Sequence, residues 1–238
     1  MICAANKVFS FDRSILARTL PFILFMGFIG MEEVIRVAVN RQWLALPDVA
    51  LYYLYPLKTL SVFALLFMYR AQYRELRLAD LRGFKTSAAV CLVGLLTFVM
   101  WVSADWSFSV AGAHNGFNPN LLPEGAIRVA MTAVRVAGAV LVVPLMEELF
   151  WRSFLLRYLV DADFESVPLG RFTWGSFLAT TVLFGLEHHL ILAGMVAGAV
   201  YSIILYKTRS LAQCVLAHAV TNLALACYVL YTGRWYFW

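Results

Sequence analysis

The sequence predicts an all-α fold, a bundle of helices that span a membrane, and its composition and apolar runs favour this class. Of the 238 residues, 62% are hydrophobic and only 14% are charged, and the mean hydropathy is +0.77. Soluble globular domains carry about 25% charged residues. A membrane-spanning helix needs about 20 mainly apolar residues in succession, and the chain repeats runs of that kind. We therefore predict one polytopic integral-membrane domain over residues 1–238.

Seven apolar segments are predicted to form spans. Pro144 interrupts the fourth, and two helices in its place would raise the number of spans to eight. The fifth and sixth share about 36 residues, which is tight for two full crossings, so short or non-crossing helices are expected there. Gly194 and Gly198 predict a close helix contact in the sixth segment. The seven segments are residues 20–39, 51–69, 87–103, 130–159, 173–189, 190–206 and 211–231.

The basic residues predict the orientation of the chain. Cytoplasmic connections carry an excess of Lys and Arg. Residues 69–85 contain five basic residues against two acidic ones, whereas residues 104–124 contain no Lys or Arg. We therefore expect a cytoplasmic N-terminus and an outer loop at residues 104–124. The same rule explains the net charge of +5 without a nucleic acid as partner.

Three polar clusters interrupt the apolar C-terminal half of the chain. Charged groups at bilayer depth cost roughly 2.5–3.5 kcal/mol each, so they mark pairs or functional sites. Glu148 and Arg152 are four residues apart and are predicted to form an ion pair on one helix face, while Glu147 projects about 100° away. His218 and Asn222 share a face for the same reason. The clusters are Glu147, Glu148 and Arg152; Glu187, His188 and His189; and His218 and Asn222.

Together these side chains supply what a hydrolase needs to use water as its nucleophile. A carboxylate deprotonates the water, an imidazole orients it, and a His/Asn pair stabilises the oxyanion. Phe184 lies one turn before His188, so its ring is expected to cover the histidine. Such a mechanism needs no cofactor and no serine or cysteine nucleophile.

The order and spacing of the motifs resemble those of a known family. Glu147-Glu148-x-x-x-Arg152, Phe184-x-x-x-His188 and His218-x-x-x-Asn222 are similar to the signature motifs of the CAAX protease and bacteriocin-processing (CPBP) family of glutamic intramembrane endopeptidases. The strings Phe-Gly-Leu-Glu-His-His and Leu-Ala-His-Ala-Val-Thr-Asn, with the ending Thr-Gly-Arg-Trp-x-Phe-Trp, resemble the CAAX protease-related proteins of bacterial exosortase systems.

The resemblance implies a bacterial inner-membrane protease whose catalytic core is built from the helices of residues 126–238, with residues 1–125 as N-terminal helices and outer loop. By this resemblance Glu147 is the general base, His188 its partner on the water, and His218 with Asn222 the oxyanion stabilisers. Glu148 and Arg152 support the site. His189 has no counterpart in the motif, and whether it shares the role of His188 stays open. The implied partners are a membrane-associated protein or peptide substrate and the lipid bilayer.

Several alternatives stay open from the sequence. Buried polar side chains also join helices in proteins without catalytic activity, such as membrane chaperones, immunity proteins or scaffolds. His188, His189, His218 and Glu147 could ligate zinc, although the chain lacks HExxH and HxxEH. Cys214 could serve as a nucleophile. Glu32, Glu33 and Arg36 form a further charged group in the first span, interpreted as an ion cluster or as the lining of a substrate path.

Overall fold

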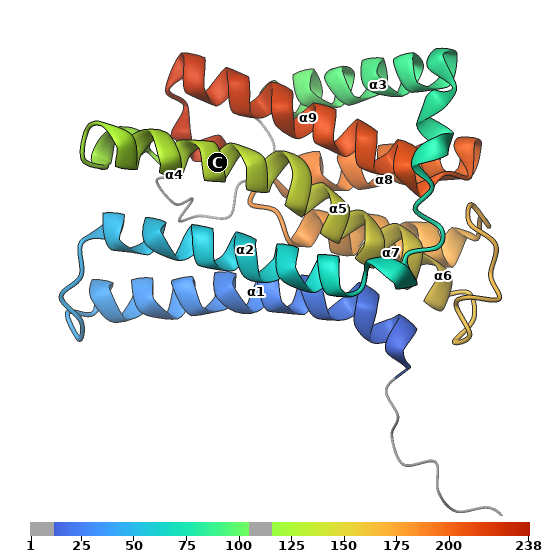
Figure 1. Ribbon diagram of the computed structural model, residues 1–238, viewed down its shortest axis with the longest axis horizontal. Coiled ribbons are helices and arrows are strands. Elements are labelled where there is room, and N and C mark those ends of the chain that lie inside the picture. Colours follow the sequence, from blue (N-terminus) through green and yellow to red (C-terminus); the bar gives the residue numbers. More distant parts are fainter. Residues whose placement is uncertain (1–11, 105–115) are drawn as a thin grey trace, which may run out of the picture.

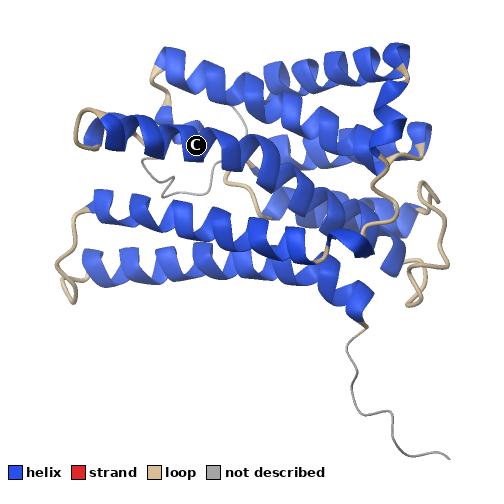
Figure 2. Ribbon diagram, viewed as in Figure 1, coloured by secondary structure: helices blue, strands red, loops and turns tan. Residues whose placement is uncertain are grey.

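The computed structural model describes residues 12–104 and 116–238, and every regular element over these residues is helical (Figures 1 and 2). The predicted all-α polytopic bundle is therefore confirmed. Most of the long helices lie side by side along the long axis of the molecule (Figure 1). The α-helices are α1 (Arg13–Asn40), α2 (Leu54–Met68), α3 (Phe84–Val102), α4 (Ala126–Ala137), α5 (Val143–Glu148), α6 (Leu156–Tyr158), α7 (Trp174–Leu186), α8 (Ile191–Thr208) and α9 (Leu211–Thr232).

Five helical segments of the described chain are long and apolar enough to cross a membrane, and each matches a predicted span. α1 has 28 residues and packs along α2, but it is not among these five. α7 has 13 residues and is about 20 Å long, short of the roughly 30 Å of a bilayer core. The residues that follow α7 therefore lie within the depth of the bundle. The five segments are Val49–Met68, Phe84–Val102, Ala126–Tyr158, Ile191–Thr208 and Leu211–Thr232.

Pro144 does not split the fourth span into two helices. The helix continues from Ala126 to Tyr158 and contains two π-helical stretches, Gly138–Val142 and Leu149–Leu155. In the first stretch the N–H of Val143 donates to the carbonyl of Gly138, five residues earlier. The next carbonyl, that of Ala139, would need the N–H of residue 144, which proline lacks. The π turn thus accommodates Pro144 and leaves one carbonyl without a partner in its own helix.

The small residues of α8 bring it close to α7, as the sequence predicts. A Cβ atom added to Gly198 would lie 3.0 Å from the ring of Phe184, and one added to Gly194 would lie 3.0 Å from the Cα of Gly185. Only glycine leaves room for backbones at this separation. The contact fixes Phe184, and with it the end of α7 that carries His188, against α8.

Candidate active site

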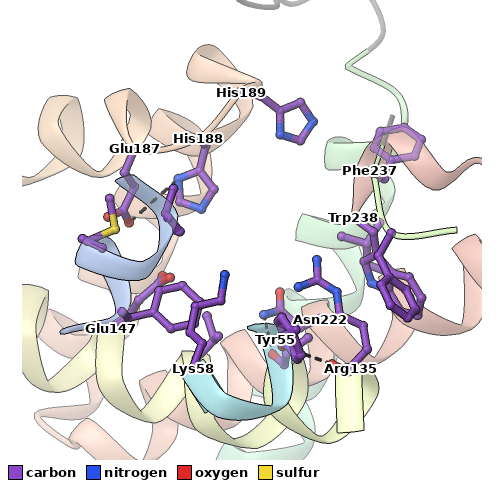
Figure 3. Close-up of a pocket in the computed structure, with 18 of the residues that line it drawn as sticks. Tyr55, Lys58, Arg135, Glu147, Glu187, His188, His189, Asn222, Phe237 and Trp238 are labelled. Carbon is purple, nitrogen blue, oxygen red and sulfur yellow. Dashed lines mark hydrogen bonds and ion pairs between the residues drawn. The ribbon is translucent and has the colours of Figure 1, made fainter. Parts of the chain in front are cut away.

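The three polar clusters converge on one cavity of about 380 Å³ (Figure 3). Glu147 enters it from α5, and Glu187, His188 and His189 enter from the junction of α7 and α8. α9 contributes His218 and Asn222 to the lining. Residues that lie up to 75 positions apart in the chain therefore share one space, as a catalytic site requires.

The predicted ion pair of Glu148 and Arg152 is present and buried. The guanidinium Nη1 lies 3.2 Å from Glu148 Oε1, and the two side chains are 2% and 0% exposed. Arg152 also donates to the carbonyl of Gly198 at 3.0 Å, and its guanidinium lies 4.4 Å from the centre of the Phe184 ring. A buried charge is tolerated where it is paired and hydrogen-bonded, and both conditions hold here.

His218 bridges the two adjacent glutamates. Its Nδ1 lies 2.9 Å from Glu148 Oε1, and its Nε2 lies 3.9 Å from Glu147 Oε2. Because a carboxylate only accepts hydrogen bonds, this contact assigns the Nδ1 proton to His218. The Tyr201 ring stacks on the imidazole at 4.7 Å and fixes its plane. Helix spacing alone does not reveal this link, since Glu148 and His218 lie on different helices.

Glu147, Glu187 and His188 surround one point in the cavity. Each offers a ligand atom, and these three atoms lie within 4.8 Å of one another. His188 Nδ1 lies 2.7 Å from the carbonyl of Phe184, so Nδ1 carries the proton and Nε2 is left to accept one. Trp151 Nε1 donates to Glu187 Oε1 at 3.1 Å. These three groups offer acceptors that could hold a water molecule beside Glu147.

Glu187 is the residue that the sequence-based site assignment left out. Its side chain is 10% exposed, and it lines the cavity together with Glu147. The available signal was its position directly before His188 in the second polar cluster. The motif spacing gave it no role, because it occupies a position that the resemblance leaves variable.

Asn222 is held by the helix distortion at Pro144. Its Nδ2 donates to the carbonyl of Ala139 at 2.8 Å, the carbonyl that the π turn leaves without a partner in its own helix. An amide nitrogen carries two hydrogens, so the second stays available on the cavity side. The structure thus places Asn222 beside the cavity with one of its two amide hydrogens already engaged.

Phe184, His189 and Cys214 are the other residues that the sequence analysis considered for the site. Phe184 is 1% exposed, and its ring centre lies 4.8 Å from that of His188. His189 also lines the cavity, but it points away from Glu187 and Glu147 in Figure 3. Cys214 is fully buried, with Sγ 3.5 Å from the carbonyls of Tyr201 and Ser210, and it is not part of the cavity lining.

The charged group of the first span lines the same cavity. Lys58 of α2 is 4% exposed, and its Nζ lies 2.9 Å from Glu32 Oε1. Arg36 Nε lies 3.9 Å from Glu33 Oε1. The interpretation as an ion cluster is therefore confirmed. These residues also border the cavity, and their role as the lining of a substrate path stays a prediction.

Comparison with known proteins supports the motif assignment. Residues 129–224 match the family model described as "Type II CAAX prenyl endopeptidase Rce1-like". This segment, 96 of the 238 residues, is similar to that family. The matched segment contains the Glu147–Glu148 pair, His188, His218 and Asn222. No curated protein and no solved structure matches the chain. The protein is thus an integral membrane protein that contains a segment similar to a family of intramembrane endopeptidases, and its assignment to the exosortase-associated subgroup stays a prediction.

Proposed function

We propose that this protein cleaves a peptide bond of a membrane-associated polypeptide by a glutamate-activated water, without a metal. The observation that carries the proposal is the convergence of Glu147, Glu187 and His188 within 4.8 Å, beside His218 Nε2. General acid–base groups act when they lie within hydrogen-bond reach of the reacting water. A water at the centre of this group would contact both a base and an orienting imidazole.

Glu147 is the general base in this mechanism. It takes a proton from the water while the water oxygen attacks the carbonyl carbon of the substrate. His188 Nε2, the unprotonated ring nitrogen, accepts a hydrogen bond from the second hydrogen of the water. This hydrogen bond orients a lone pair of the water oxygen toward the carbonyl carbon. Glu187, held by Trp151, is the second carboxylate that borders the water. Glu147 then passes its proton to the amide nitrogen, the C–N bond breaks, and an amine and a carboxylic acid leave.

The oxyanion of the tetrahedral intermediate faces donors from α9. Asn222 supplies the Nδ2 hydrogen that Ala139 does not engage. His218 donates from Nε2 in its doubly protonated form, in which Glu148 at Nδ1 stabilises the cation. The proton on Nε2 is in place before the water attacks, so the proton that Glu147 takes from the water is the one that leaves with the amine. Arg152 holds the Glu148 carboxylate in place as its buried ion-pair partner. Preorganised donors of this kind contribute about 2.7–4 kcal/mol each to the rate where they have been removed singly.

A comparison of peptide termini in the native host tests the proposal. Cells that lack their own copy would receive wild type, Glu147→Gln or the control Glu124→Gln, whose side chain is 89% exposed. We expect a set of new peptide termini with wild type and Glu124→Gln that is absent with Glu147→Gln. Identical termini in all three strains, with the proteins present at equal levels in the membrane, would show that Glu147 has no proteolytic role.

A metal-dependent hydrolase is the second candidate, and one observation favours it. Glu147, Glu187 and His188 are close enough to share a divalent cation, although this set differs from the zinc ligands considered from the sequence. Two carboxylates and one imidazole leave open positions for water, as catalytic metal sites do. Metal analysis of protein purified with and without chelator separates the two candidates. Stoichiometric metal whose removal abolishes activity would replace the metal-free mechanism.

A further inference from the structure

The cavity occupies one half of the molecule. On α1 its lining begins at Phe25 and continues to Arg36, and on α2 the last lining residue is Lys58. Both sets lie toward the α1–α2 turn and away from the connection between α2 and α3. Phe237 and Trp238, beyond the end of α9, complete the wall at the same end. Figure 1 shows the α1–α2 turn and the start of α4 together at the left end of the bundle.

The opposite end of the bundle is closed by a buried polar network centred on Arg18. This side chain is 2% exposed, and it contacts both carboxylate oxygens of Glu75 at 2.8 Å. It also donates to Ser153 Oγ at 3.0 Å and to the carbonyl of Gln72 at 2.9 Å. Burial would raise the pKa of Glu75, but the hydrogen bond and charge of Arg18 outweigh it and lower that pKa below its usual value.

The same network includes the start of the loop that precedes α7. Arg157 is 6% exposed and donates to Ser153 Oγ at 3.0 Å and to the carbonyl of Val167 at 3.3 Å. The ring of Phe164 contacts both guanidinium groups, with its centre 5.1 Å from that of Arg18 and 4.9 Å from that of Arg157. The start of α1, the connection between α2 and α3, the end of the Ala126–Tyr158 helix and the loop after it are thus joined at this end, and none of the network residues named here lines the cavity.

The closed end also carries most of the basic residues outside the bundle core. Cytoplasmic loops and the adjacent helix ends carry the excess of Lys and Arg, so the closed end is the cytoplasmic one. The connections and flanking helix turns at the closed end contain Arg70, Arg74, Arg77, Arg82, Lys85, Arg171, Lys207 and Arg209, whereas those at the other end contain Arg41, Arg128 and Arg234.

We propose that the cavity receives its substrate from the extracytoplasmic side, so that the substrate class is a polypeptide segment exposed at the outer face of the membrane. This inference rests on the proposed function. The wall facing Glu147 suits a polar peptide, because it contains the Glu32–Lys58 pair and Arg135. The Arg135 guanidinium lies 4.4 Å from the ring centre of Tyr55 and 5.6 Å from that of Trp238. A lipid-modified tail in the cytoplasm would meet the closed end instead.

Cysteine labelling in intact cells tests the direction of access. The four native cysteines are replaced by alanine, and single cysteines are introduced as Glu33→Cys in the cavity wall, Arg41→Cys at the open end and Arg74→Cys at the closed end. A membrane-impermeant charged maleimide is the probe. We expect Arg41→Cys and Glu33→Cys to react in intact cells, and Arg74→Cys to react only after permeabilisation, with at least a ten-fold difference in labelling rate.

Each other outcome overturns the proposal. Labelling of Arg74→Cys but not Arg41→Cys in intact cells would show the reverse orientation. Labelling of Arg41→Cys without Glu33→Cys would show that the outer face does not give access to the cavity, and Ile29→Cys, also in the lining, serves as a second reporter if Glu33→Cys does not accumulate. Labelling does not require hydrolysis, so failure of the proposed function, seen as an active Glu147→Gln, and failure of the access proposal, seen in the labelling pattern, are distinguishable.

Discussion

Replacing Arg152 by methionine tests the energetic role of the buried ion pair. Arg152 is 2% exposed and Glu148 is 0% exposed, so the change leaves a buried carboxylate with His218 as its remaining hydrogen-bond partner among the described side chains. Removing one partner of a buried pair costs about 3–5 kcal/mol. The loss of the ring contact with Phe184 acts in the same direction. We therefore expect Arg152→Met to be among the most destabilising single changes in this half of the chain.

The chain contains a matched control for this variant. Glu124 and Arg128 have the same spacing of four residues, but Glu124 is 89% exposed and the N–O distance is 3.7 Å. Exposed pairs contribute roughly 0.2–1 kcal/mol, and Arg128 also donates to the carbonyls of Leu122 and Asn120. Because Arg128→Met leaves no buried charge without its partner, it should destabilise the protein less than Arg152→Met does. The double variant Glu148→Met/Arg152→Met removes both buried charges and should be more stable than Arg152→Met alone.

Unfolding of the purified variants in lipid nanodiscs, followed by circular dichroism, measures these differences. The reasoning predicts the order wild type, Arg128→Met, the double variant and then Arg152→Met, from most to least stable. If Arg152→Met were as stable as Arg128→Met, burial would not govern the strength of the pair, and the account of Glu148 and Arg152 as a buried pair that stabilises the fold would be wrong.

Three further variants test other parts of the account. Asn222→Ala removes the donor to the Ala139 carbonyl and the free amide hydrogen, so steady-state kinetics should show kcat lowered by about 10²–10³ with little change in KM; an unchanged kcat would remove Asn222 from the mechanism. Glu187→Gln keeps an oxygen for Trp151 and should lower kcat less than Glu187→Ala does; equal losses would contradict a positioning contribution from this contact. Glu75 has a lowered folded-state pKa, so its stabilisation is present above its usual pKa of 4.5 and is lost as pH falls through the folded-state value. The difference in Tm between wild type and Glu75→Gln should be widest near neutral pH and should shrink in acid; a difference that is constant with pH would contradict the paired state of Glu75.

The helices could be predicted because their length and apolar character are local properties. Each of the five membrane-length segments overlaps a predicted span, and the shortage of residues between 171 and 206 indicated the short α7. The backbone conformation at Pro144, a continuous helix with a π-helical turn, could not be predicted in the same way. A proline removes one N–H whichever helix form follows, and the partner of the carbonyl left free here, Asn222, lies 83 residues away.

The site was predictable as far as helix periodicity extends. The spacing of Glu148 and Arg152 predicts an ion pair on one helix, and that pair is present. The contact of His218 with Glu148 depends on how α9 is rotated against α5, which is a property of tertiary packing. The approach of Glu187 to Glu147 likewise depends on α7 ending within the bundle, so no pattern in a single segment could assign it.

The most direct test of the account is the hydrolysis rate of Glu147→Gln on a substrate identified in the host. Glutamine keeps the shape of the side chain but cannot take a proton from water, and removal of a general base costs about 10²–10⁴ in rate. We predict that Glu147→Gln unfolds at the same temperature as wild type within a few degrees, and that its kcat is lower by at least 10². A kcat within ten-fold of wild type, with the control Glu124→Gln fully active, would contradict the assignment of Glu147 as the base.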